Sequence, residues 1–204
     1  TGLMRIRSIL LPDTYDVLND PITGKHEFYP KGGETIKELT SLGASTKTLA
    51  LGNFASTTGA MMLERLTDVP YEGEDIPLGL RATDRFLMAL TRLTGAEIPE
   101  KIEEERGKLV DIISDMHQYL HGKTFALFGD PDHLIPLTEF LMDLDMIPRY
   151  IVSGTPGKYF RSRMNALMEK YGHTAVIKNG AEADIFYLHQ HIKNEKVDLL
   201  AGNT

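Results

Sequence analysis

Two aspartates, Asp111 and Asp115, are the residues whose type and spacing best suit a metal ion. Side chains four positions apart project from the same face of a helix, so the two carboxylates can be presented together. Oxygen ligands of this kind suit calcium, magnesium or ferrous iron. The simpler interpretation is a solvated helix face, because Lys108 lies in the same row and can form an ion pair with Asp111. Spacing alone favours that simpler interpretation.

Histidines offer a second possible metal site. His117 and His121 are also four positions apart and lie beside Asp115, a geometry that suits a metal ion. However, His121 directly precedes Gly122 at the expected end of a helix, where an imidazolium is favoured by the helix dipole alone. His189 and His191, two positions apart, face different sides of a helix and make a poor metal pair.

Two glycine-containing turns lie where α/β proteins often bind phosphate groups. Residues 129–132 (Gly-Asp-Pro-Asp) lack the G-x-G-x-x-G pattern, and their two carboxylates would repel an anion. Capping of a helix by Asp130, with Pro131 as the first helical residue, is therefore the favoured interpretation. Residues 154–158 (Gly-Thr-Pro-Gly-Lys) suit an anion better, but they lack P-loop spacing and a plain loop is favoured.

The elements that would position these residues follow a recurring pattern. A short apolar run ends in a glycine beside a polar residue, and a helical pattern follows; such runs cover residues 49–53, 126–130, 150–154, 176–180 and 199–203. Runs without polar alternation are typical of parallel strands buried on both faces. Helical patterns cover residues 34–42, 54–66, 132–145, 157–171 and 181–195. The pattern predicts an α/β protein with parallel sheets.

Two consecutive helical patterns, at residues 83–94 and 99–120, interrupt this alternation. We therefore predict two Rossmann-like parallel-sheet domains: an incomplete one over residues 1–78, and a helical connector with a second domain over residues 79–204. The acidic segment 67–78 is predicted to be a crossover loop. Because the first domain has too few elements and the chain stops directly after a strand, we expect a truncated chain.

Composition excludes several classes of protein. A net charge of −7 without a basic stripe argues against a nucleic-acid partner. No apolar run approaches the ~20 residues needed to cross a bilayer, and we expect a cytoplasmic protein without a membrane partner. The absence of cysteine excludes disulfides, thiolate zinc sites and any thiolate-ligated iron–sulfur cluster held by this chain alone.

Several segments, in the same order, resemble the β chain of the dinitrogenase component (molybdenum–iron protein type) of nitrogenase. They are residues 10–14, 16–18, 29–33, 76–80, 82–88, 105–132 and 197–204. The resemblance implies the nitrogenase component 1 fold and matches the C-terminal portion of the β chain. For the parent it implies ATP-dependent reduction of N2 to ammonia, with the α chain, a second β chain and the iron protein as partners. It also implies a P-cluster held by amino-terminal cysteines and a metal cofactor on the α chain. This chain is itself expected to be structural, with no cofactor and no catalytic residue.

The same resemblance gives Asp111 and Asp115 a specific role. In the family, aspartates of the matching segment help to bind a divalent cation between two β chains, and the other ligands come from the amino-terminal part of the partner. Two alternatives stay open. One is the β-type subunit of the nitrogenase cofactor-assembly scaffold, and the other is a stand-alone nucleotide- or sugar-binding α/β module.

Overall fold

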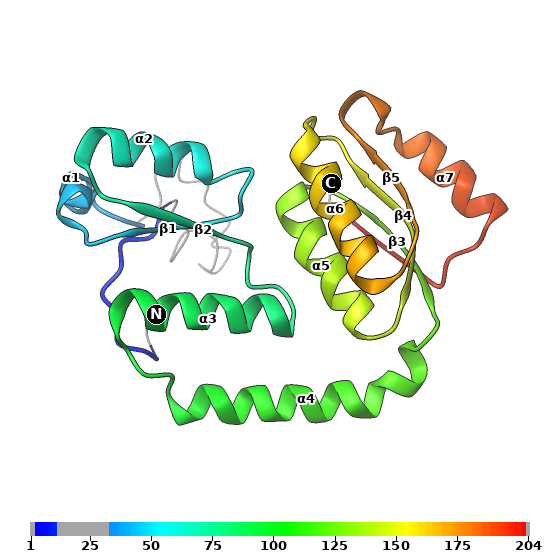
Figure 1. The fold of residues 1–204 in the computed structure, drawn as a ribbon, viewed down its shortest axis with the longest axis horizontal. Coiled ribbons are helices and arrows are strands. Elements are labelled where there is room, and N and C mark those ends of the chain that lie inside the picture. The colour runs from blue at the N-terminus through cyan, green and yellow to red at the C-terminus, as the bar shows by residue number, and fades with distance from the viewer. Residues whose placement is uncertain (1–2, 12–32, 203–204) are drawn as a thin grey trace, which may run out of the picture.

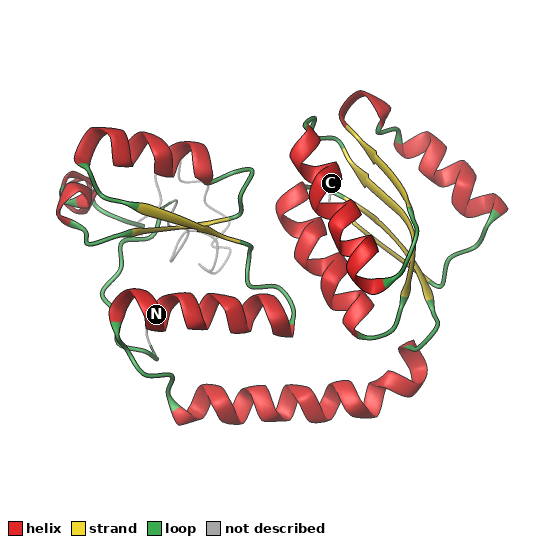
Figure 2. Ribbon diagram, viewed as in Figure 1, coloured by secondary structure: helices red, strands yellow, loops and turns green. Residues whose placement is uncertain are grey.

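The computed structural model describes residues 3–11 and 33–202 of the chain. Helices and strands alternate along much of this length (Figure 1). The strands form two separate groups, and two consecutive helices run between them (Figure 2). Residues 12–32 and 203–204, which carry part of the family resemblance, lie outside the described residues.

The first group of strands forms a two-stranded parallel sheet. Its elements are α1 (Ile36–Thr40), the 3-10 helix η1 (Leu42–Ala44), β1 (Thr48–Leu51), α2 (Thr57–Thr67) and β2 (Tyr71–Glu74). The prediction of a crossover loop over residues 67–78 is therefore wrong at its centre, where β2 pairs with β1. The sequence Tyr-Glu-Gly-Glu has no buried apolar pattern, so only the backbone pairing makes it a strand.

Side chains from neighbouring segments secure β2. Nζ of Lys47 lies 2.8 Å from the carboxylate of Glu72. At Gly73, an added Cβ would lie 2.8 Å from the amide oxygen of Asn53, so glycine leaves the room that this side chain fills. The strand is thus specified by partners twenty or more positions away in the sequence, which explains why its own residues do not predict it.

Two helices, α3 (Leu80–Thr94) and α4 (Glu100–Leu120), connect the two groups of strands as an antiparallel pair (Figure 1). Arg106 of α4 donates two hydrogen bonds of 2.9 Å to the carboxylate of Asp84 on α3. No residue of α4 is buried, and Ile112 and Met116 on its apolar stripe are exposed. None of the helices in the described ranges is both long and apolar enough to span a membrane.

The second group is a four-stranded, fully parallel sheet with the order β5-β4-β3-β6. Its elements are β3 (Thr124–Phe128), α5 (Pro131–Asp143), β4 (Ile147–Ser153), α6 (Lys158–Tyr171), β5 (Val176–Asn179), the 3-10 helix η2 (Gly180–Glu182), α7 (Ile185–Asn194) and β6 (Leu199–Gly202). The predicted α/β class with parallel sheets is confirmed.

Helices cover both faces of this sheet, with α5 and α6 on one face and α7 on the other (Figure 1). Residues of β3 alternate between the two layers: Phe125 and Leu127 belong to the main core, and Ala126 to the smaller one beneath α7. Helix α5 begins at Pro131, as predicted, and continues through Pro136, which is fully buried. The larger core therefore lies between the sheet and α5 and α6.

Candidate functional site

Asp111 and Asp115 lie exposed on α4, as their spacing predicts. Lys108 does not pair with Asp111; its ammonium group lies 2.8 Å from Glu105 instead. Within residues 3–11 and 33–202, neither aspartate carboxylate has a hydrogen bond or an ion pair. An ion pair with Lys108 therefore does not explain these two carboxylates, which are left free to meet a cation or solvent.

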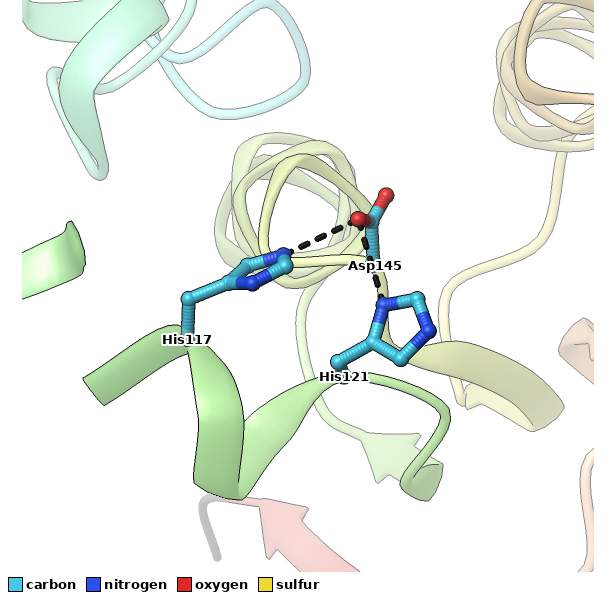
Figure 3. A group of neighbouring side chains, drawn as sticks. All are labelled: His117, His121 and Asp145. Carbon is cyan, nitrogen blue, oxygen red and sulfur yellow. Dashed lines mark hydrogen bonds and ion pairs between the residues drawn. The ribbon is translucent and has the colours of Figure 1, made fainter. Parts of the chain in front are cut away.

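One turn further along α4, two histidines meet a carboxylate that the sequence did not indicate (Figure 3). Nε2 of His117 lies 2.9 Å from Oδ2 of Asp145, and Nδ1 of His121 lies 3.3 Å from the same oxygen. These hydrogen bonds hold the pKa of Asp145 below its usual value. The sequence placed both histidines beside Asp115, whereas the structure brings them to Asp145.

Asp145 owes this position to the turn between α5 and β4. It lies just beyond the end of α5 with a left-handed backbone, at φ 56°. Glycine is the usual residue for this conformation, although aspartate tolerates it better than most. No local pattern links this turn to α4, so sequence reasoning had no signal that could have found the contact.

The histidines of α7 do not come together. The ring of His191 stacks on Tyr150 with centroids 5.0 Å apart, and His189 is exposed. The hydroxyl of Tyr150 donates a hydrogen bond of 3.1 Å to Glu195. Burial, and then this bond, raise the pKa of Tyr150. His191 is thus an aromatic packing partner, in agreement with the unfavourable spacing.

In the segment 129–132, the Asp132 carboxylate accepts hydrogen bonds from two backbone amides. Asp130 occupies the N-cap position of α5, but its side chain makes no capping bond. Asp132 is buried, and its carboxylate accepts hydrogen bonds from the backbone amides of Phe54 (3.0 Å) and Ala55 (2.8 Å). Those amides lie in the turn after β1, a position at which α/β proteins commonly bind an anion. Here the Asp132 carboxylate occupies the position of that anion. Sequence reasoning treated this carboxylate only as a source of repulsion.

The turn at residues 154–158 lies beside a shallow depression lined by residues that include Lys158, Arg161 and Asn179. Arg161 is already paired with Glu182 at 2.9 Å, and Lys178 lies 3.5 Å from the same carboxylate. The amide of Asn179 donates to the carbonyl of Gly157 at 2.9 Å. Because Arg161, Lys178 and the turn backbone have internal partners, this geometry favours a plain loop over an anion site.

A set of charged side chains, also missed by the sequence, links the small sheet and α3 to α5 and α6. Glu139 on α5 is 2.9 Å from Arg85 and 2.7 Å from Lys170. Burial alone would raise the pKa of Glu139, but the hydrogen bonds from Lys170 and Arg85 outweigh it and the pKa is lowered. Asp75, next to β2, lies 2.7 Å from Arg163 on α6. These pairs hold the two groups of strands together.

Comparison with known proteins shows that this chain is similar to nitrogenase proteins. The family model described as nitrogenase component 1 type oxidoreductase matches residues 3–204. The molybdenum–iron protein β chain of Clostridium pasteurianum is 47% identical over 201 residues, which are 98% of this chain and 44% of that protein. The corresponding chain of Frankia alni is 35% identical over 98% of this chain and 38% of its own length.

A solved structure titled "Nitrogenase Cp1 at pH 6.5" has the same fold. It superposes with a TM-score of 0.93 at 46% identity, over 98% of this chain and 43% of the solved chain. The chain therefore spans less than half the length of the relatives that it matches.

Proposed function

Because the chain belongs to the nitrogenase component 1 type oxidoreductase family, we propose that it forms part of a molybdenum–iron protein β chain. In that role it contributes to ATP-dependent reduction of N2 to ammonia by a complex that also contains an α chain, a second β chain and the iron protein. The observation that carries the proposal is the 47% identity to such a β chain across nearly the whole of this sequence.

The role proposed for this chain within the complex is structural. The family implies an iron–sulfur P-cluster in the complex, and such clusters are held mainly by cysteine thiolates. This sequence contains no cysteine, so its residues do not fit the ligand set of the cluster. No electron-transfer step is assigned to it. We place two domains at residues 1–78 and 79–204, a division supported by the two separate sheets.

Asp111 and Asp115 are the proposed ligands of a divalent cation at the contact between two β chains. Both are exposed on α4, and both offer hard oxygen donors of the kind that calcium or ferrous iron accepts. Two carboxylates leave most of the coordination shell to other ligands, which the partner β chain would supply. When bound, the ion would neutralise two like charges and join α4 to the partner.

A segment exchange tests the proposal. Residues 1–204 replace the matching segment of the Clostridium pasteurianum β chain, and the hybrid is produced with its α chain and iron protein. We expect the hybrid to co-purify with the α chain and to reduce acetylene. The 204-residue chain alone should contain no iron or sulfide and show no acetylene reduction.

Two controls sharpen this test. A hybrid carrying Asp111→Asn and Asp115→Asn should fold and bind the α chain but lose divalent cation and β–β association. Acetylene reduction by the isolated chain would overturn the proposal, as would a soluble, folded hybrid that does not bind the α chain. Tight nucleotide binding by the isolated chain would instead support the α/β-module alternative.

A further inference from the structure

We propose that His117, His121 and Asp145 form a binding site for a divalent first-row transition ion, with Zn²⁺ as the reference ion, that fastens the end of α4 to the turn between α5 and β4. The proposal concerns residues other than the Asp111 and Asp115 pair, and it does not depend on the function proposed above. It adds a second, chemically different metal site to the same helix.

Each histidine donor atom lies from the Asp145 carboxylate at a separation close to the one that a bound metal ion requires. Two ligands bound about 2.0–2.1 Å from a tetrahedral zinc ion lie roughly 3.3 Å from each other. Oδ2 of Asp145 lies 2.9 Å from Nε2 of His117 and 3.3 Å from Nδ1 of His121. All three donor atoms lie within 4.8 Å of one another, and no other group of three possible ligands is found in the described ranges.

Local structure holds these donors in place. His117 and His121 lie one turn apart at the end of α4, and their rings are 5.4 Å apart between centroids. The backbone amide of Gly122, directly after His121, donates a hydrogen bond of 2.9 Å to the carbonyl of Asp145. This bond holds the turn against the end of the helix. Binding therefore requires little rearrangement of either segment.

The backbone of Asp145 adopts a left-handed conformation that is uncommon for residues other than glycine. A non-glycine residue at φ 56° occupies a conformation in which glycine is less strained. Aspartate tolerates this conformation better than most residues and, unlike glycine, supplies a carboxylate at this turn. Here the carboxylate of that residue is the group that meets both histidine rings (Figure 3).

The ligand set indicates which ions fit. Two imidazoles and one carboxylate suit zinc, cobalt, nickel or ferrous iron, whereas calcium and magnesium prefer oxygen ligands alone. His117 would bind through Nε2 and keep its proton on Nδ1, and His121 would bind through Nδ1 and keep its proton on Nε2. Three protein ligands leave at least one position open to water, because the site is exposed.

Binding would have a structural consequence for α4. This helix has no buried residue, and Ile113 and Leu120 are only partly buried where they pack against the main core of the second sheet. A metal ion shared by α4 and the turn at Asp145 would join the connector to the four-stranded sheet. The ion would thereby restrict the motion of the helix that carries Asp111 and Asp115.

The test is titration of the purified, untagged 204-residue chain with ZnCl2 in a calorimeter, and with CoCl2 followed by visible absorption. We expect one Zn²⁺ per chain, a Co²⁺ spectrum with nitrogen and oxygen ligands, and slower amide hydrogen exchange near residues 117–122 and 143–147 when Zn²⁺ is bound. His117→Gln, His121→Gln and Asp145→Gly should each weaken Zn²⁺ binding at least about tenfold.

Asp145→Gly is the decisive variant, because glycine relieves the left-handed backbone while it removes the carboxylate. Its melting temperature without metal should equal or exceed that of the wild type, so weaker binding cannot be attributed to unfolding. His189→Gln, on an exposed histidine of α7, should bind Zn²⁺ like the wild type. The proposal is overturned if the wild type does not bind Zn²⁺, or if Asp145→Gly binds it as tightly as the wild type.

Discussion

A Cβ atom added to Gly52 would lie only 2.8 Å from Oδ2 of Asp132. Gly52, directly after β1, has a backbone φ of +88°. The buried Asp132 carboxylate packs against it and accepts hydrogen bonds from the amides of Phe54 and Ala55. The carboxylate and the glycine are therefore in direct contact. Through this contact the first turn of α5 packs against the end of β1 in the small sheet.

Gly52→Ala should destabilise the protein. The new methyl group would overlap the Asp132 carboxylate, and alanine is strained at positive φ, so a loss of about 1–3 kcal/mol is expected. Urea unfolding followed by circular dichroism measures it. Gly59→Ala is the matched control, because that glycine lies within α2 with open space around it and alanine favours the helix. Equal stability of the two variants would contradict the assigned contact.

Asp132→Ala should also cost about 1–3 kcal/mol, because two amides in a partly buried turn lose their acceptor. Asp130→Ala, at the neighbouring exposed position whose side chain makes no capping bond, should change the unfolding free energy little. In the double variant with Gly52→Ala, the two losses should not add, because the methyl group no longer meets a carboxylate. Additive losses would show that the residues act separately.

Glu139→Gln should destabilise the contact between α5 and its neighbours. The Glu139 side chain is only 8% exposed and accepts charged hydrogen bonds from Arg85 and Lys170, so loss of its charge should cost about 1–3 kcal/mol. Glu169→Gln, on the exposed surface of α6, is the control. The melting temperatures of the two variants are compared by thermal unfolding at neutral pH. An unchanged melting temperature for Glu139→Gln would count against a stabilising role of its charge.

Asp198 should make stability depend on acid pH. Hydrogen bonds from the amide and hydroxyl of Thr124, and then from Lys123, lower its pKa from 3.8 to about 2. Because the folded pKa is the lower one, its stabilisation is fully present above pH 3.8 and is lost as pH falls toward 2.

Asp198→Asn should accordingly reduce the change in melting temperature between pH 4 and pH 2, and lower the melting temperature most at neutral pH. Asp130→Asn, at an exposed aspartate whose side chain makes no capping bond, should leave the melting temperature at neutral pH nearly unchanged. Parallel profiles for the wild type and Asp198→Asn would contradict the assignment.

The local order of residues determines much of this fold. Apolar runs ending in glycine, such as residues 126–129, predict buried parallel strands, and Pro131 predicts the start of α5; both agree with the structure. Helical spacing likewise places Asp111 and Asp115 together on an exposed face of α4. These features depend on neighbours within a few positions, so periodicity is sufficient to predict them.

Only the tertiary structure decides which distant groups meet. Asp145 joins His117 and His121 from 28 and 24 positions away, and Asp132 reaches the amides of Phe54 and Ala55 from 78 and 77 positions away. The weakly patterned β2 is a strand because its backbone pairs with β1. Such contacts depend on how helices and sheets pack, which residue spacing along the chain does not encode.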